Sequence, residues 1–124
     1  MATHDEMLAA FDGALDGSNP DAFVAVLAPG AVIWHNHDRK EVDARDNMAA
    51  IGMLAQLVDE LKNEHLLFAP IDGGFVLQYV TRGTVRSNGN AFEMHNCIIV
   101  STNDDGMITR IDEYVDPTVG AQFA

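Results

Sequence analysis

The sequence predicts a single α+β domain, with helices in the first half of the chain and an antiparallel sheet in the second. Up to about residue 62, apolar residues recur mostly at helical spacing, and beyond it they alternate as in strands. Turns rich in Asn, Asp, Pro and Gly connect the later segments, and turns that short join antiparallel neighbours. A chain of 124 residues suffices for one core and is too short for two, so residues 1–124 form one domain.

Capping residues mark the starts of the first two helices. Thr3 and Glu6 form a capping box ahead of the first helix, which Gly17 can close. Asn19-Pro20 is typical of an N-cap followed by proline at the first helical position, where its missing N–H is not needed. The second helix is expected to end at Pro29-Gly30.

The remaining elements follow from the same patterns. A short strand is expected over residues 31–37, ending in a polar loop over residues 38–41. A third helix opens at Asp43 and Asp46 and runs to about Lys62, with an apolar stripe on its buried face. The helices are expected to cover one face of the sheet. Four strands complete the chain, over residues 64–69, 75–86, 91–101 and 107–116.

Charge and cysteine content narrow the classes of partner. Nineteen acidic against seven basic residues give a formal net charge of −12, which repels phosphates, so we expect no nucleic-acid partner. The apolar runs end short of a membrane span and no leader-like segment opens the chain, so we expect no membrane association. Cys97 is the only cysteine, which favours a reducing, cytoplasmic location.

The last predicted strand carries the most informative residue. Strand alternation places Ile111, Glu113 and Val115 on one face, and an apolar–Glu–apolar row is unusual for a face turned to solvent. If that face looks into the core, burial raises the pKa of Glu113 toward the range of a general base. The alternatives are a solvated glutamate on an outer face, or a buried one paired with an arginine.

Three segments carry a resemblance to a known family: FDGALDGSNPDAF (residues 11–23), VIWHNHDRKEVDARDNMAAI (residues 32–51) and ITRIDEYVDP (residues 108–117). In order and spacing they resemble SnoaL-like proteins, in the superfamily of nuclear transport factor two and ketosteroid isomerase. The resemblance implies a curved antiparallel sheet forming a cone around the N-terminal helices, with a pocket at its open end and frequent dimers. It implies no single reaction, because the superfamily mixes isomerases, cyclases, epoxide hydrolases and non-catalytic binders.

The resemblance also implies roles for single positions. The tyrosine that polarises the ketone in steroid isomerases falls at Phe11, which has no hydroxyl to donate. The proton-shuttling aspartate of those enzymes falls near Trp34 or His35. Glu113 resembles the last-strand aspartate with which limonene epoxide hydrolases activate water.

Two further motifs of the epoxide hydrolases match in part. Their water-positioning Tyr-x-Asn resembles residues 34–36, where Asn36 matches and Trp34 replaces the tyrosine. Their Arg-x-Asp resembles residues 82–84, where Arg82 matches and Thr84 replaces the aspartate. Trp34 is also expected to form a wall of the pocket.

Arg82 and His95 are candidate partners for Glu113. Arg82 lies in an apolar strand, where it either pairs with Glu113 and lowers the pKa of that carboxylate or lies on the outer face of the sheet. His95 beside Glu113 would serve as an acid, a base or a hydrogen-bond donor near neutral pH, and is otherwise structural. Strand alternation alone does not tell which face turns inward.

Metal and cofactor signals are weak. The spacing of His35 and His37 places two imidazoles on one face of a strand, but no further His or Cys completes a recognisable ligand set. The glycines lack phosphate-loop spacing. We therefore expect no metal site and no cofactor.

Together these features favour a cytoplasmic, dimeric pocket enzyme that performs acid/base chemistry on a small apolar or polycyclic molecule. Isomerase, cyclase and epoxide-hydrolase chemistry stay open, and the alternative is a ligand-binding or dimerisation module without catalysis. The expected catalytic residues are Glu113, Arg82 and His95. The expected substrate-binding residues are Phe11, Trp34, His35, Asn36, Ile51 and Thr84.

Overall fold

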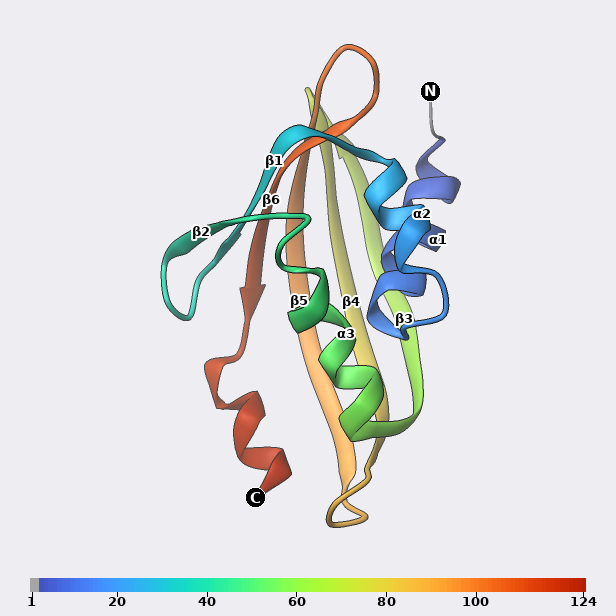
Figure 1. Ribbon diagram of the computed structural model, residues 1–124, viewed down its shortest axis with the longest axis vertical. Coiled ribbons are helices and arrows are strands. Elements are labelled where there is room, and N and C mark those ends of the chain that lie inside the picture. Colours follow the sequence, from blue (N-terminus) through green and yellow to red (C-terminus); the bar gives the residue numbers. More distant parts are fainter. Residues whose placement is uncertain (1–2) are drawn as a thin grey trace.

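The structure, a computed structural model, describes residues 3–124 apart from the side chain of Ala49, and it has two layers (Figure 1). A curved six-stranded sheet forms one layer, and the N-terminal helices cover its inner face. The helices are α1 (His4–Leu15), α2 (Pro20–Ala25) and α3 (Met48–Leu57), and a 3₁₀ helix, η1 (Pro117–Phe123), ends the chain. The strands are β1 (Leu27–His35), β2 (Lys40–Asp43), β3 (Val58–Ile71), β4 (Gly74–Val85), β5 (Ala91–Thr102) and β6 (Ile108–Val115).

The first two helices start where the sequence predicts them. Thr3 caps α1, because its side-chain oxygen accepts a hydrogen bond of 3.1 Å from the Glu6 amide. Asn19 caps α2 in the same way, with Pro20 as the first helical residue. No helix within residues 3–124 has the length and apolar character needed to cross a membrane.

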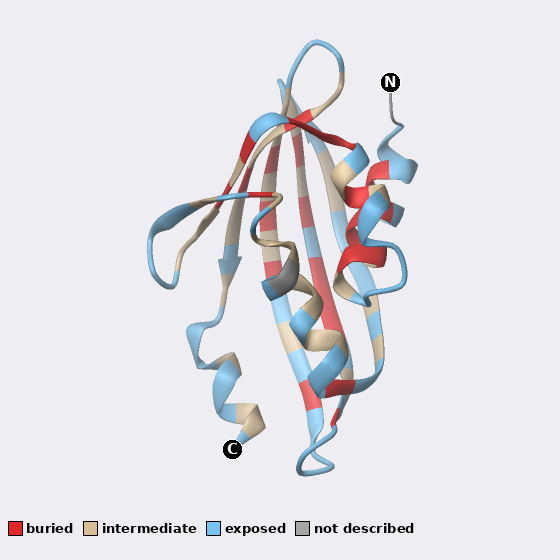
Figure 2. Ribbon diagram, viewed as in Figure 1, coloured by how far each residue is buried: buried red, intermediate tan, exposed pale blue. Residues whose placement is uncertain are grey.

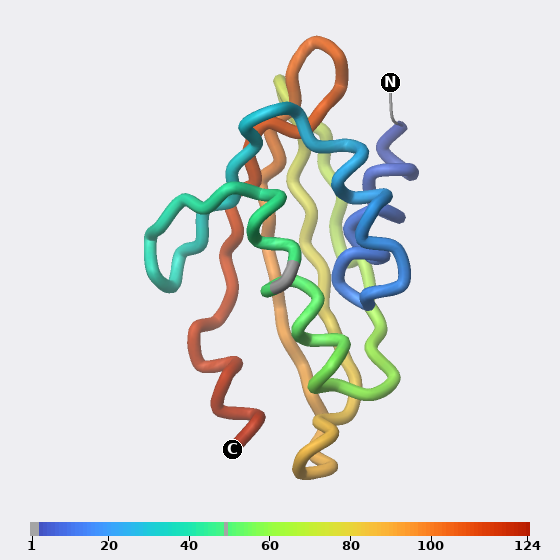
Figure 3. Tube along the Cα trace, in the orientation of Figure 1, coloured from blue at the N-terminus to red at the C-terminus, as the bar shows by residue number. Residues whose placement is uncertain are grey.

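The order of strands in the sheet is β2-β1-β6-β5-β4-β3, so strands from the two ends of the chain lie side by side. Strands β3 to β6 form the predicted antiparallel meander. In contrast, β1 pairs with β6 in parallel. Figure 3 shows the chain returning at β6 to lie against β1. This pairing has no local signal in the sequence, because no turn joins the two strands.

The boundary between α3 and β3 differs from the prediction. The helix ends at Leu57 rather than near Lys62, and β3 begins at once with Val58. Val58 and Leu61 fall within the range predicted as helix, yet they belong to β3 and cluster with Phe92. Both arrangements bury the same residues, so apolar spacing does not separate helix from strand here, whereas β-branched Val58 favours the strand.

The segment around β1 and β2 also differs from the prediction. β1 begins at Leu27 rather than Ala31, and Pro29-Gly30 lies inside it, where the register with β6 shifts. A bulge of this kind tolerates both residues. The predicted loop over residues 38–41 contains the start of β2, a short polar strand that pairs antiparallel with β1 and shows no apolar alternation.

The core lies between the helices and the inner face of the sheet (Figure 2). Phe11 and Phe23 from the helices pack with strand residues such as Leu77 and Ile98. A smaller apolar cluster lies at the other end of the long strands, where Phe123 of η1 packs against it. The space between these two clusters is where polar side chains enter the interior.

The start of β3 lies so close to β4 at Gly83 that a side chain there would not fit. A Cβ added to Gly83 would lie 2.4 Å from Cγ1 of Val58 and 2.7 Å from the carbonyl oxygen of Asp59. We expect Gly83→Ala to lower the free energy of unfolding by about 1–3 kcal/mol in urea denaturation, because the start of β3 must move.

The control for this prediction is Gly52→Ala in α3. Among the described residues, no atom outside the helix lies within 4 Å of a Cβ added at Gly52. This variant should gain up to about 1 kcal/mol from helix propensity. Equal stability of Gly83→Ala and the parent protein would contradict the register of β3 on β4.

Candidate functional site

Glu113 borders an apolar cavity between the sheet, α1 and α3. Two adjoining hollows, of about 30 Å³ and about 130 Å³, share Leu15, Ile51, Tyr79 and Glu113 in their walls, and we call them together the inner cavity. The other walls of the smaller hollow are Phe11, Ala14, Phe23, Ile33, Ile98 and Ile111. The other walls of the larger hollow are His35, Asn47, Ala50, Leu54, Met94 and Asn96.

Burial raises the pKa of Glu113 above its ordinary value of 4.5, and charges on His35 and His37 lower it in part. His35 pairs with Glu113 in the β1–β6 register. Nε2 of His35 lies 3.9 Å from Oε1 of Glu113, beyond hydrogen-bond distance but within reach of charge attraction. The Glu113 side chain keeps 29 % of its surface exposed, so a small molecule in the cavity can reach the carboxylate.

Tyr79 is a site residue that the sequence did not single out. It lies on β4, is 5 % exposed, and lines both hollows of the inner cavity with Glu113. Burial raises the pKa of the Tyr79 hydroxyl well above its usual value, and the charges of Glu113 and Asp12 raise it further. The hydroxyl therefore stays protonated and can donate a hydrogen bond inside the cavity. Its alternation with Phe75 and Leu77 could have placed it on the inner face.

Two helical residues, Phe11 of α1 and Ile51 of α3, also line the inner cavity. Phe11 lines the smaller hollow and Ile51 lines both hollows, so each contributes an apolar wall. Tyr79 brings a hydroxyl from β4 into the hollow that Phe11 of α1 lines. The structure thus brings Phe11, His35, Ile51 and Glu113 to one cavity.

A separate polar network joins α1 to β3. The Oδ1 atom of Asp12 accepts hydrogen bonds from Asn63, at 3.2 Å, and from Nε2 of His65, at 2.9 Å. The hydroxyl of Thr81 in turn donates to Oδ1 of Asn63 at 2.6 Å. These groups satisfy one another, so the network accounts for the polar residues at this edge of the core without a ligand.

Asn36 fastens the end of β1 to β6. Its Nδ2 donates to the carbonyl oxygen of Val115 at 3.1 Å, and its Oδ1 accepts from the Val115 amide at 3.0 Å. The backbone amide of Asn36 donates to the carbonyl oxygen of Glu113 at 3.1 Å. Both side-chain atoms of Asn36 thus bind the backbone of Val115, which gives Asn36 a structural role at the end of β1.

Arg82 and His95 do not meet Glu113 in the structure. Both lie on the outer face of the sheet, where Arg82 pairs with Glu64 and Glu93, and His95 pairs with Glu93. Glu93 and His95 are more than a third exposed, and the hydrogen bond from His95 lowers the pKa of Glu93. The expectation that these two residues share the pocket with Glu113 is wrong, because strand alternation turns them the other way.

Trp34 and Thr84 lie outside the inner cavity as well. Trp34 is on the outer side of β1, where its ring packs on Tyr114 with centroids 5.4 Å apart. Thr84 is exposed near the end of β4, paired with Asp59 and Ala91. Neither residue lines the inner cavity.

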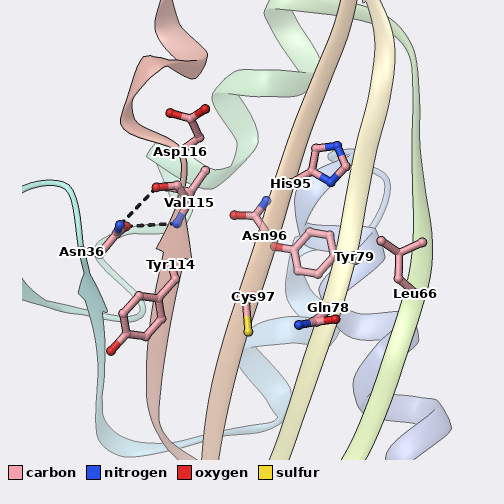
Figure 4. A pocket seen from close by; sticks show the side chains of 10 residues that line it. All are labelled: Asn36, Leu66, Gln78, Tyr79, His95, Asn96, Cys97, Tyr114, Val115 and Asp116. Atoms are coloured by element: carbon pink, nitrogen blue, oxygen red, sulfur yellow. Dashed lines mark hydrogen bonds between the residues drawn. The ribbon is translucent and has the colours of Figure 1, made fainter.

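A larger hollow of about 430 Å³ lies along the outer face of the sheet (Figure 4). Its walls include Leu66, Gln78, His95, Cys97 and Tyr114. Tyr79 and Asn96, which line the inner cavity, border this hollow as well. We call it the outer groove. It exceeds the inner cavity in volume, but it is open and Glu113 does not line it, so we place the candidate chemistry in the inner cavity.

His35 ends β1, and His37 lies in the turn that follows it. The rings of His35 and His37 lie 5.3 Å apart, tilted by 54°. Within the part of the chain that the structure describes, no three His, Cys, Asp or Glu side chains are arranged to hold a metal ion.

Comparisons with known proteins agree on the fold. No family model and no curated protein matches the sequence, whereas 245 chains of solved structures match the structure. A protein from Jannaschia sp., assigned as a SnoaL-like polyketide cyclase, is 15 % identical over 97 % of this chain and 90 % of its own, with a TM-score of 0.79. A protein of ketosteroid isomerase-like fold from Catenulispora acidiphila, crystallised with trimethylamine, is 16 % identical over 97 % of this chain and 93 % of its own, with a TM-score of 0.76.

An NTF2-like protein from Burkholderia thailandensis matches equally well, with 19 % identity over 99 % of this chain and 98 % of its own and a TM-score of 0.75. The chain therefore has the NTF2-like fold, shared with ketosteroid isomerase-like and SnoaL-like proteins, as the sequence motifs imply. Structural similarity at sequence identities below one fifth shows the fold but does not specify a reaction.

The raised pKa of Glu113 predicts how stability depends on pH. The protonated carboxyl contributes its full stability below its unfolded-state pKa of about 4.5, and this contribution is lost as the pH rises through the raised folded-state pKa. Glu113→Gln keeps a neutral group at every pH. We expect its melting temperature to match that of the parent protein near pH 4 and to exceed it at pH 7, as measured by calorimetry. A lower melting temperature of the variant at pH 7 would contradict the burial of the charge.

Proposed function

We propose that this protein is a cytoplasmic, cofactor-free enzyme that uses Glu113 as a general base on a small, mainly apolar molecule bound in the inner cavity. The observation that supports the proposal is the Glu113 carboxylate in an apolar cavity together with the buried hydroxyl of Tyr79. A carboxylate with a raised pKa is a stronger base than one in water, and a site without bulk water strengthens hydrogen bonds to developing charge. Solved neighbours named for polyketide cyclase and ketosteroid isomerase-like folds support this class of chemistry without choosing a reaction.

The proposed step moves one proton. Ionised Glu113 takes a proton from a substrate carbon next to a carbonyl group, and the electron pair of the broken C–H bond moves onto the carbonyl oxygen. Tyr79 donates a hydrogen bond to that oxyanion. Protonated Glu113 then returns the proton to another carbon, which completes an isomerisation. If Glu113 instead removes a proton from water, the hydroxide opens an epoxide and the resulting alkoxide takes up the proton.

His35 supports Glu113 in this proposal without touching the substrate. At 3.9 Å, a protonated His35 stabilises the ionised carboxylate and holds its pKa below the value that burial alone would produce. His35 therefore opposes the effect of burial and favours the ionised, basic form of Glu113.

The volume of the inner cavity limits the size of the substrate. Its two hollows, of about 30 Å³ and about 130 Å³, are comparable together to an apolar cavity of about 150 Å³ that accommodates benzene. A molecule with one small ring fits this volume. Of the small and polycyclic classes that the sequence favours, the cavity supports the first, since a polycyclic molecule would require α3 to move away from the sheet.

A non-catalytic ligand-binding module is the second candidate. The observation that favours it is the small number of polar partners at Glu113, because Arg82 and His95 lie on the other face of the sheet and Phe11 carries no hydroxyl. Such a module would bind the same small molecules and release them unchanged.

Proton exchange separates the two candidates. We expect the protein to catalyse deuterium exchange from D₂O into small enolisable ketones, or uptake of ¹⁸O from labelled water into small epoxides, both followed by mass spectrometry. Glu113→Gln should lower the rate at least about 100-fold, the typical contribution of a general base, and the parent rate should fall as the pH drops through the raised pKa of Glu113.

The matched controls for this experiment are Arg82→Gln and His95→Gln on the outer face, which should keep the parent rate. Full activity of Glu113→Gln would remove the general-base role. Saturable binding of the same compounds without exchange or ¹⁸O uptake would favour the binding module.

We also propose that the outer face of the sheet binds a second copy of the chain. Leu66 and Leu67 lie where β3 shifts register against β4, and they are 53 % and 47 % exposed. Tyr114 on β6 is 45 % exposed and lines the outer groove with Leu66. Exposed apolar side chains gathered on one sheet face are typical of a protein contact.

A negative charge introduced at Leu66 tests this contact. In analytical ultracentrifugation the parent protein should sediment as a dimer of two 13.5 kDa chains. Leu66→Glu should sediment as a monomer, because burying the new carboxylate in the interface would cost its hydration. Met53→Glu is the control, since Met53 is equally exposed, at 54 %, but lies on α3. A monomeric parent protein at micromolar concentration would refute the dimer.

A further inference from the structure

Asn96 is a buried polar side chain for which the fold supplies no partner. It is 5 % exposed, and among residues 3–124 neither its Nδ2 nor its Oδ1 atom has a hydrogen-bond partner. Buried side-chain amides nearly always find partners, because an unpaired one loses its bonds to water without replacement. Asn36 illustrates the usual arrangement, since its amide uses both atoms on Val115.

Asn96 lies on the inner face of the sheet, in the wall of the inner cavity. On β5 it pairs with Tyr79 of β4 and with Val115 of β6, and it shares the inner face with Ile98, the partner of Glu113. It lines the larger hollow together with Tyr79 and Glu113. Figure 4 shows the Asn96 amide and the Tyr79 phenol as neighbours on adjoining strands.

We propose that the Asn96 amide recognises the ligand of the inner cavity, and that this ligand is an uncharged molecule whose polar group both accepts and donates a hydrogen bond. The proposal rests on the inner cavity as the site of the proposed function, and it names the chemical class of ligand. A hydroxyl, an enol or a carboxamide meets the requirement, because it accepts from Nδ2 and donates to Oδ1.

Other polar groups leave one side of the amide unpaired. A plain ketone or ether offers no proton to Oδ1, so a ketone substrate is bound more weakly than the enol that it forms, and an ammonium group offers no lone pair to Nδ2. A carboxylate offers no proton either, and it would stand beside Glu113 as a second negative charge. The complementarity of a primary amide therefore selects hydroxyl, enol and amide ligands among molecules of the same size.

The two hollows of the inner cavity would then hold different parts of the ligand. The polar group lies in the larger hollow with Asn96, whereas the hydrocarbon part extends toward the apolar hollow that Phe11 and Ile98 line. An enol held in this way places its oxygen beside Tyr79 and its carbon skeleton near Glu113. Recognition by Asn96 is thus compatible with proton transfer by Glu113 and does not depend on it.

A pair of probes of equal size tests the proposal. Phenol and toluene have the same shape, but only phenol can accept and donate a hydrogen bond. We expect the full chain to bind phenol at least tenfold more tightly than toluene in an amide NMR titration, with the largest shifts at Asn96, Ile98 and Glu113. Asn96→Leu should instead bind toluene more tightly than phenol, with the ratio of the two dissociation constants changed at least tenfold from that of the parent protein. Its melting temperature should equal or exceed that of the parent protein.

Two variants accompany this measurement. Asn96→Ala adds no bulk, and it should lose the phenol preference even if the leucine variant does not fold. Gln78→Leu removes the same amide group from the neighbouring outer-face position on β4, and it should leave the ratio unchanged.

The proposal is overturned if the parent protein shows no preference for phenol, or binds neither probe. It is overturned likewise if Asn96→Ala keeps the preference. A third contrary result is a melting temperature that Asn96→Ala lowers by more than Gln78→Leu does, because the amide would then have a structural role. The proposed catalytic function fails separately. Loss of the phenol preference in Asn96→Ala with full activity in Glu113→Gln would retain the recognition and remove the general base. The opposite pair of results would do the reverse.

Discussion

The parallel pairing of β1 with β6 is the constraint on which the rest of this structure depends. It joins a strand from the first third of the chain to the last strand, and its register places His35 opposite Glu113. Asn36 extends the pairing by using its side-chain amide on Val115 as a further backbone partner would. Without this contact the end of β6, which holds the carboxylate, would be supported by β5 alone. The geometry of the candidate site is therefore set by backbone hydrogen bonds between distant segments.

The two faces of the same sheet treat charge in opposite ways. On the outer face, Arg82 meets Glu64 at an exposed position, where ion pairs are screened and contribute little to stability, and Arg110 pairs with Asp112 where both are partly exposed. On the inner face, Glu113 has His35 at 3.9 Å, and burial raises its pKa. Alternation along one strand is enough to separate these environments, because successive side chains point to opposite faces. A carboxylate suited to chemistry and an ordinary surface ion pair thus lie a few residues apart.

The distribution of unsatisfied polar groups follows the same division. Asp12, Asn63 and Thr81 are hydrogen-bonded to one another at the edge of the core. The side-chain amide of Asn36 is hydrogen-bonded to the backbone of Val115. Around the inner cavity, in contrast, Asn96 has no protein partner among the described residues. Functional sites commonly retain such groups at the expense of stability. Glu113 is expected to follow the same rule, because its buried charge lowers stability at neutral pH and Glu113→Gln should therefore raise the melting temperature.

Local signals in the sequence determined the α+β class, the starts of α1 and α2, the four-strand meander and the unusual position of Glu113 in an apolar row. These features depend on caps, turns and alternation, which involve residues close together in the chain. The same signals misplaced the end of α3, because Val58 and Leu61 are buried by either a helix or a strand.

Only the tertiary structure decided which face of each strand turns inward. That choice depends on which surface the helices cover, and it separates Arg82, His95, Trp34 and Thr84 from Glu113. It also brings Tyr79 and Asn96 together at the cavity from neighbouring strands, a pairing that alternation within either strand does not specify. The sequence by itself therefore determined the catalytic candidate, whereas its neighbours follow from long-range packing that no local pattern encodes.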